Sequence, residues 1–196
     1  MLRLPALRVV SVCAAATFVV AAATTVRARG VTTTTRRDPV YAGLVGHWQG
    51  TVQVRDRRDT TRRVTLSTKV RVRPTPGSDA LEMHFTTSNR TGGEWIDTDR
   101  LLFDTSMTAA QWGAMADSWP QHFDVQVLDP RASTVTSPAL PLRLVLEAEG
   151  SIDDSPATIR QTMTMRPGEI RIVQETRTDG GSFEFQREYV LRRIAG

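Results

Sequence analysis

The feature that most constrains the fold is a repeated alternation of apolar and polar residues, which runs between turn-forming residues from residue 45 to residue 193. Successive side chains of a β-strand point to opposite faces, so this alternation predicts antiparallel strands with one buried face. Pro, Gly, Asp and Thr between the alternating segments suit tight turns. The expected strands span 45–55, 63–73, 80–88, 95–103, 121–128, 140–149, 158–166, 169–178 and 182–193.

Residues 108–119 fit two structures. Trp112 and Trp119 would lie on one face of a helix that Pro120 ends, and residue propensities mildly favour this short helix. Because the segment lies among strands, the alternative is a tenth strand over 110–117 that forms a hairpin with the next strand. The sequence leaves both structures open.

Many consecutive up-and-down strands either close on themselves or leave unpaired edges, and closure is the usual arrangement for one sheet of this size. We therefore expect an all-β fold, an antiparallel up-and-down β-barrel of about 9–10 strands, with or without a short helix near 108–119. A sandwich of two sheets is the main alternative, because periodicity alone does not show closure.

The first 28 residues have the pattern of a cleavable secretory signal peptide. Arg3 and Arg8 precede an apolar run over 9–23, and small residues follow this run. We expect residues 1–28 to be removed and the protein to be exported, either to the periplasm or outside the cell. The apolar run is shorter than the roughly 20 residues of a membrane-spanning helix, so an uncleaved anchor is the weaker alternative and no span is expected in the mature chain.

The mature chain is expected to form one domain. Residues 29–38, which include four consecutive threonines, are expected to be a disordered tether. The remaining residues, 39–196, are enough for one β-barrel domain with its own hydrophobic core. The only cysteine, Cys13, lies in the expected signal peptide, so the mature chain would form no disulfide and no thiolate metal site.

The net charge of +4 does not indicate a nucleic-acid partner. The 25 basic side chains include Arg3, Arg8 and Arg27, so cleavage after Ala28 leaves 22 basic against 21 acidic side chains. The remaining arginines are interspersed with aspartate and glutamate, which is typical of a solvated surface rather than a phosphate-binding stripe. We therefore expect no binding to nucleic acid.

Turn chemistry gives a register for the last three expected strands. A two-residue turn at 167–168 places Gln161 opposite Gln174, and a two-residue turn at 180–181 places Gln174 opposite Arg187. One polar row then lies among more apolar rows on the same face. The four rows are Ile159, Thr176, Phe185; Gln161, Gln174, Arg187; Met163, Ile172, Tyr189; and Met165, Ile170, Leu191.

The two ends of the expected barrel resemble the lipocalin-like (calycin) superfamily, especially its small bacterial members of unknown function. The resemblance rests on the Gly-x-Trp element Gly46-His47-Trp48 in the first strand and on the arginine-rich last strand. It implies a β-barrel in which Trp48 closes one end and an arginine near the chain's end packs across it. Pairing of the first and last strands puts Arg193 level with Trp48, so Arg193 is the candidate for this contact and Arg187 lies deeper. A shared fold does not by itself transfer a function.

Arg187 and Tyr189 also resemble, in their Arg-x-Tyr order, the carboxylate-binding pair of intracellular fatty-acid-binding proteins of the same superfamily. A guanidinium matches a carboxylate with two parallel hydrogen bonds, and a tyrosine hydroxyl adds a directed donor. We therefore expect the interior to bind a small hydrophobic or amphipathic anion of the carboxylate type, with Gln161 and Gln174 orienting Arg187. The apolar part of this ligand is expected to be lined by Met83, Phe85, Met163 and Phe185.

A second interpretation of Arg187 is structural. The two glutamines and an acidic residue such as Asp97 or Glu94 would then satisfy the guanidinium inside a filled barrel, as is common for buried charges. In that case the protein would be a structural or interaction module of the cell envelope, with Trp112 or Trp119 exposed as a contact patch.

No complete catalytic or metal-binding signature occurs in the sequence. His47, His84 and His122 lie on the polar phase of their strands, lack the spacing of metal ligands, and are expected to point to solvent. Nucleophile elbows, phosphate loops and dinucleotide fingerprints are absent. We expect no cofactor, no metal and a binding protein rather than an enzyme. The enzyme alternative requires a roomy pocket and an inward carboxylate of raised pKa near Tyr189.

Overall fold

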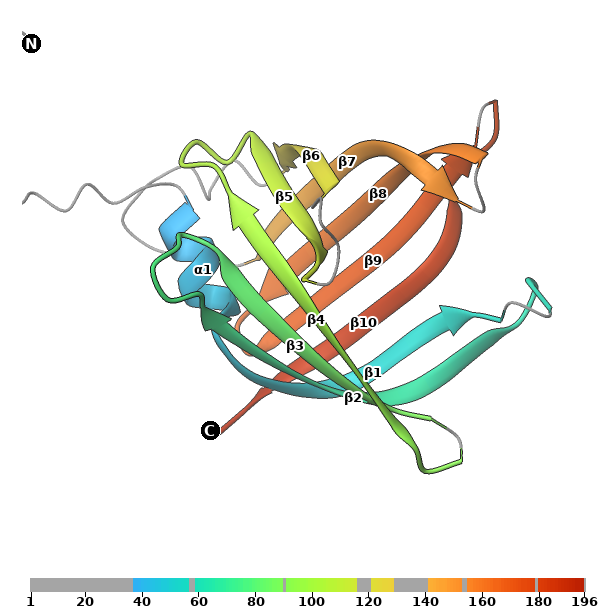
Figure 1. Ribbon diagram of the computed structural model, residues 1–196, viewed down its shortest axis with the longest axis horizontal. Helices are drawn as coiled ribbons and strands as arrows, with labels where there is room; N and C mark the ends of the chain where they lie inside the picture. The colour runs from blue at the N-terminus through green and yellow to red at the C-terminus, as the bar shows by residue number, and fades with distance from the viewer. Residues whose placement is uncertain are drawn as a thin grey trace, which may run out of the picture. The chain divides into compact units, whose positions relative to one another are not determined.

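The structure, a computed structural model, describes residues 37–56, 59–89, 91–115, 121–128, 141–152, 155–178 and 180–195. This part of the chain is an all-β barrel of ten antiparallel strands with one short helix (Figure 1). Each strand pairs with its neighbour in sequence, and β1 pairs with β10 to close the barrel. The elements are α1 (Arg37–Leu44), β1 (Gly46–Arg55), β2 (Arg63–Pro74), β3 (Leu81–Ser88), β4 (Glu94–Phe103), β5 (Ala109–Ala114), β6 (Gln121–Val127), β7 (Leu142–Ile152), β8 (Ser155–Arg166), β9 (Glu169–Thr178) and β10 (Glu184–Ile194).

The alternation of the sequence therefore predicted the fold class correctly. All nine expected strands are present, with ends that differ by a few residues. The ambiguous segment 108–119 contains the tenth strand, β5, rather than a helix. This strand pairs with both β4 and β6, and that pairing satisfies backbone groups that a helix would leave unpaired at two strand edges.

The short helix lies instead at the start of the described chain. Arg37 and Asp38, which the sequence analysis assigned to the tether, begin α1. Asp38 and Pro39 in the first turn are a recognisable helix-start signal, because proline suits that turn and an acidic side chain favours the positive end of the helix dipole. The expected signal peptide and the rest of the expected tether lie outside the described residues.

The registers expected for the last three strands are confirmed over most of their length. Gln161 pairs with Gln174 across β8 and β9, and Gln174 pairs with Arg187 across β9 and β10. The expected pairing of Thr176 with Phe185 is wrong, because Phe185 pairs with Glu175. A β-bulge between Phe185 and Arg187 shifts the register by one residue.

The bulge re-aims the end of β10. Gln186, the extra residue, donates a hydrogen bond from Nε2 to the buried hydroxyl of Thr176 at 2.7 Å. Phe185 instead stacks against the guanidinium of Arg63, whose Cζ lies 3.9 Å from the ring centroid. Phe183, just before β10, lies in the same way against the outward-facing arginines of β8 and β9. Phe183 and Phe185 thus both pack against arginines on the outside of the barrel.

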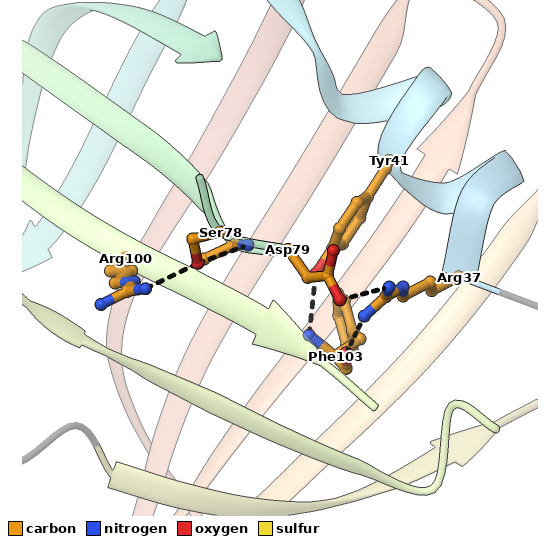
Figure 2. A network of polar contacts seen from close by, with 7 residues as sticks. Arg37, Tyr41, Ser78, Asp79, Arg100 and Phe103 are labelled. Atoms are coloured by element: carbon orange, nitrogen blue, oxygen red, sulfur yellow. Dashed lines mark hydrogen bonds and ion pairs between the residues drawn. The ribbon is translucent and has the colours of Figure 1, made fainter. Parts of the chain in front are cut away.

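One end of the barrel is closed by α1, and we call it the closed end. Val40 and Leu44 of α1 are buried in the same core cluster as Trp48 and Phe103. Figure 2 shows how α1 is fastened to the strands: Arg37 forms an ion pair with Asp79 at 2.8 Å and donates to the carbonyl of Phe103 at 3.3 Å. The Tyr41 hydroxyl accepts a hydrogen bond from the backbone N–H of Phe103 at 2.9 Å.

Trp48 and Arg193 complete the closed end. The Trp48 indole donates to the carbonyl of Leu44 at 2.8 Å, and the Arg193 guanidinium lies 4.4 Å from the Trp48 ring. Arg193 also donates to the carbonyls of Gly43 and Val45, at 2.6 and 2.8 Å, where the last carbonyls of α1 lack helical partners. This end thus joins the two termini of the described chain through one tryptophan and one arginine.

Two glycines permit this close packing. Gly46 has a φ of +142°, a backbone conformation that side chains rarely adopt, and a Cβ there would lie 2.7 Å from the Arg193 guanidinium. Gly50 lies against β10 so closely that a Cβ would meet the carbonyl oxygen of Val190 at 1.9 Å. Both glycines therefore allow the close packing at which β1 pairs with β10 and the barrel closes.

The opposite end of the barrel, where β1, β3, β7 and β9 end and β2, β4, β8 and β10 begin, is called the mouth. Along the inward phase of β4, Phe103 and Leu101 are fully buried, Asp99 is partly buried, and Asp97 and Trp95 are exposed. Along β10, Leu191 is buried whereas Tyr189 and Arg187 are only partly so. Along β4 and β10, solvent therefore reaches the inward side chains near the mouth but not those near the closed end.

Candidate functional site

The sequence-predicted polar row lies inside the barrel, at the boundary between the closed half and the mouth half. Six strands contribute side chains to a cavity of about 10 Å³ at this level. Its polar lining, which we call the polar cluster, consists of Asp99, Gln161, Gln174, Arg187 and Tyr189. Phe85, Trp112 and Ile172 complete the lining.

Arg187 is the cationic member of the polar cluster. Its Nε donates a hydrogen bond to the side-chain oxygen of Gln174, the residue directly opposite on β9. Among the residues that the structure describes, no carboxylate forms an ion pair with Arg187. Arg187 also makes a side-chain hydrogen-bond contact with the Tyr189 hydroxyl. A guanidinium has five N–H groups, so these contacts with uncharged groups leave further donors inside the barrel. Because Arg187 is only partly buried, these donors are within reach of solvent from the mouth.

Tyr189 lies one step deeper on the same strand. Its ring packs against Phe85 with centroids 5.1 Å apart, and the Arg187 guanidinium carbon lies 5.8 Å from the Tyr189 centroid. Burial raises the pKa of Tyr189 above its ordinary value; the positive charge of Arg187 opposes this, and the negative charges of Asp99 and Asp97 add to it. Tyr189 therefore keeps its proton at neutral pH and can donate a hydrogen bond.

Asp99 and Trp112 form the opposite wall of the cavity, and the sequence analysis assigned neither to the site. The Trp112 indole donates to the carboxylate of Asp99 at 2.9 Å. Asp99 shares the inward phase of β4 with Leu101 and Phe103, so the parity of two buried residues was the signal that could have found it. Asp97, one step nearer the mouth, is on the same phase and is exposed.

The expected apolar lining residues have different positions. Phe85 lines the cavity. Met83 and Met163 are buried in the core cluster of the closed half and do not line the cavity. Phe185 lies outside, against Arg63, because of the bulge in β10. The structure therefore brings Arg187, Tyr189, Gln161 and Gln174 together but does not surround them with the expected methionines.

The size of the cavity limits what the interior can hold. A volume of about 10 Å³ is roughly the space that one water molecule needs. Below it, the inward side chains of the closed half are packed and buried, including Leu144, Met163 and Leu191. A molecule larger than water must therefore approach the polar cluster from the mouth, past Asp97 and Trp95.

The described part of the chain contains no candidate metal site. Within it, no three His, Cys, Asp or Glu side chains come together in a way that would hold a metal ion. His47 and His122 are exposed, and His84 is partly exposed on the outer face of β3, where it contacts Glu82 and Thr98 at 3.2 and 3.1 Å. The described helix is also too short and polar to cross a membrane.

Comparison with known proteins shows the fold. No protein-family model matches the chain, and no curated protein matches it in sequence. Among solved structures, the chain is similar to the crystal structure of Rv2717c from M. tuberculosis, with a TM-score of 0.53. The alignment covers 80% of this chain and 96% of that chain at 12% sequence identity. At that identity, the likeness supports the closed barrel and carries no function.

Proposed function

We propose that the protein is an exported member of the lipocalin-like (calycin) superfamily that binds a small carboxylate-bearing molecule in the mouth half of its barrel. The proposal rests on the Arg187 guanidinium, which lies inside the barrel and is partly exposed to the mouth. Among the described side chains it contacts the uncharged groups of Gln174 and Tyr189 and forms no ion pair with a carboxylate. The signal-peptide pattern and the Trp48–Arg193 contact at the closed end support export and superfamily membership.

The chemistry of the polar cluster narrows the ligand. The guanidinium of Arg187 offers a planar pair of donors to a carboxylate, and the protonated Tyr189 hydroxyl adds a third donor. Asp97 and Asp99 would repel a ligand that carries only negative charge. A ligand that also carries a hydroxyl or ammonium group offsets this repulsion by donating to those carboxylates.

The volume of the cavity argues for a short ligand. The packed closed half leaves no space for a long hydrocarbon chain, since Met83 and Met163 are each at most 1% exposed and belong to the core. The anionic group therefore enters head first and the rest of the molecule remains near the mouth, beside Trp95 and Asp97. The proposed ligand class is thus a short hydroxy or amino carboxylic acid, rather than a long-chain fatty acid.

Acid-base catalysis has less support than binding. An inward carboxylate, Asp99, does lie beside the same cavity as Tyr189. However, burial raises the pKa of Tyr189, so the phenolate that would act as a base is scarce at neutral pH.

Calorimetric titration of a panel of carboxylic acids tests the proposal. The panel contains short acids with a hydroxyl or amino group, their unsubstituted counterparts, and a long-chain fatty acid. We expect the substituted short acids to bind most tightly, and Arg187→Gln to weaken their binding by roughly tenfold or more, because a hydrogen bond to a charged group contributes about 1.5–3 kcal/mol. Glutamine keeps a donor at the position while removing the positive charge.

Arg166→Gln is the matched control, because Arg166 is exposed on the outer phase of β8. It should leave the titration unchanged. Failure of every short acid to bind, or equal binding by wild type and Arg187→Gln, would overturn the proposal. Binding of the fatty acid alone would contradict the ligand class.

A further inference from the structure

The outer face of β1 to β4 carries a groove that the interior site does not use. Register places His47, Arg71 and His84 in one cross-strand row, and Gln49, Lys69 and Thr86 in the next. The groove has a volume of about 380 Å³. We call it the basic groove; its outward-facing lining comprises His47, Lys69, Arg71, Arg73, His84, Thr86, Ile96 and Ile194.

The charge of the basic groove has one sign. Lys69 is the only lysine of the chain, and it lies beside Arg71 on β2. Among the described residues, no carboxylate forms an ion pair with either of them. Glu82 lies on β3 directly opposite Arg73. Its carboxylate forms an ion pair with Arg73 at 2.8 Å and contacts His84 at 3.2 Å. Two permanent cations therefore face outward without a counter-charge from the described residues.

The outer face of β7 to β9 is arranged differently. There, Arg160 lies between Glu147 and Glu175 in one cross-strand row and pairs with Glu147 at 2.6 Å. Arg171 forms an ion pair with Glu188 of β10. Opposite charges across neighbouring strands are the ordinary arrangement of a solvated sheet, and the two rows through Lys69 and Arg71 lack that arrangement.

Exposed aliphatic side chains adjoin these cations. Ile96, at the β4 side of the groove, is 71% exposed, the largest exposed fraction among the large hydrophobic side chains of the described residues. Ile194, at the β10 side, is 40% exposed. The outward phase of a strand normally carries polar residues, so isoleucine at both borders indicates contact with an apolar medium or partner.

We propose that the basic groove docks on the surface of an anionic phospholipid bilayer. Lys69 and Arg71 attract the phosphate headgroups, and Ile96 and Ile194 insert at the boundary between headgroups and acyl chains. A bilayer fits better than an acidic protein because the groove presents no outward-facing tryptophan, tyrosine or phenylalanine; Trp48 borders it but is only 2% exposed. Protein interfaces depend on such aromatic anchors. The mouth of the barrel remains open to ligand in this arrangement, since the groove lies on the side wall.

Co-sedimentation of the full chain with lipid vesicles tests the docking. Vesicles of phosphatidylcholine alone are compared with vesicles of equimolar phosphatidylglycerol and phosphatidylcholine. Because the apolar run at residues 9–23 would bind any bilayer, the phosphatidylcholine vesicles give the baseline. We expect tighter binding to the anionic vesicles, weakened by added salt, which screens charges beyond about 10 Å at 0.1 M.

Two variants with the same change in charge locate the contact. The double variant Lys69→Glu and Arg71→Glu should weaken binding to anionic vesicles by roughly tenfold or more, because each basic residue near a charged membrane contributes about 1 kcal/mol. The control double variant, Arg143→Glu and Arg166→Glu on the outer face of β7 and β8, should retain wild-type binding. All four positions are exposed. Ile96→Ser, which changes no charge, should weaken binding to anionic vesicles severalfold and tests the same face if the groove double variant does not fold.

Four outcomes would overturn the proposal. The wild type could bind both kinds of vesicle equally, or the control variant could lose as much binding as the groove variant. Full displacement from vesicles by millimolar glycerol phosphate would indicate a site for one soluble phosphate. Binding to polyglutamate that equals vesicle binding and is unaffected by Ile96→Ser would indicate an acidic protein partner instead.

Discussion

The closed half and the mouth half of the barrel are built from the same strands, yet they differ in what occupies the inward phase. In the closed half this phase carries apolar side chains such as Leu101 and Leu191, which are at most 1% exposed. In the mouth half the same strands place Asp99 and Arg187 inside. Apart from the bulge in β10, the same strand pairs continue from one half to the other, so most of the difference lies in side-chain chemistry.

Within one sheet, the closed half thus serves stability and the mouth half is the candidate for ligand recognition. Burial of apolar area is the main favourable contribution to folding, and the closed half supplies most of it. Polar groups inside a barrel oppose burial unless they are paired, so a partly exposed polar cluster contributes little to stability. Because the polar cluster contributes little to stability, its presence beside a well-packed core favours a role in ligand binding.

Loss of the closing tryptophan should produce the largest effect on stability. Trp48 is 2% exposed, donates to the Leu44 carbonyl and contacts Arg193. Trp48→Ala should lower the free energy of unfolding by about 3–5 kcal/mol. Trp95→Ala in the mouth, where the side chain is 38% exposed, should cost less than about 1 kcal/mol. Urea denaturation measures both, and equal losses would show that the two halves do not differ in stability.

Arg193 should have the next largest effect. Arg193→Met keeps much of the apolar stem but removes the contact with Trp48 and the hydrogen bonds to Gly43 and Val45. We expect a loss of about 2 kcal/mol in the free energy of unfolding, since hydrogen bonds from a charged donor contribute about 1.5–3 kcal/mol and solvent weakens them here. Arg192→Met, one residue earlier and on the outer phase, is the matched control. A loss no greater than that of the control would remove Arg193 from the closure of the barrel.

The sequence predicted the closed half more completely than the mouth half. Alternation sets the inward phase, and the turn at 167–168 sets the register of β8 and β9, so the apolar rows and the Gln161–Gln174 pair could be derived. The contact of Trp48 with Arg193 followed from a resemblance combined with strand pairing. These inferences depend only on periods and turns, which are local properties of the chain.

The mouth half depends on properties that are not local. The bulge at Gln186 turns Phe185 out of the barrel, and no residue type in that strand announces it. The volume of the cavity is the space left between side chains from six strands. The volume of a cavity cannot be derived from a pattern along the chain. Met83 and Met163 were therefore expected to line a ligand cavity, whereas they are buried in the core.

The closed end should also set a dependence of stability on acid. Burial opposes ionisation of Asp104, but hydrogen bonds from Ser106, Ala109 and Thr108 outweigh it and lower the pKa of this carboxyl to about 2. Because the pKa is lower in the folded state, its contribution is present above pH 3.8 and is lost as the pH falls toward 2. We expect about 1 kcal/mol after allowing for solvent screening.

Melting temperatures of the wild type and Asp104→Asn between pH 2 and pH 6 measure this contribution. The two curves should converge as the pH falls, because the wild-type carboxyl becomes protonated. Asp124→Asn changes an exposed carboxyl on β6 and serves as the control, with a curve close to that of the wild type. A constant difference between wild type and Asp104→Asn over the whole range would contradict the assignment.

The smallest effect on stability, and the most direct probe of the mouth half, concerns Tyr189. Arg187→Met removes a positive charge that lowers the pKa of Tyr189, so the pKa should rise further above its ordinary value, while stability near neutral pH changes by less than about 1 kcal/mol. The chain has two tyrosines, so tyrosinate absorbance in an alkaline titration resolves them once Tyr189→Phe identifies the remaining one as Tyr41.

Arg37→Met is the matched control at the closed end, because Arg37 lowers the pKa of Tyr41 and should leave Tyr189 unchanged. A raised tyrosine pKa in the folded state means that stability falls as the pH rises above about 10, where the unfolded chain loses its proton first. Arg187→Met should shift the alkaline pH at which the free energy of unfolding falls. It should not alter the fall in acid to which Asp104 contributes. If the Tyr189 titration were identical in wild type and Arg187→Met, the guanidinium would not lie beside the phenol, and the basis for placing a ligand carboxylate between them would be gone.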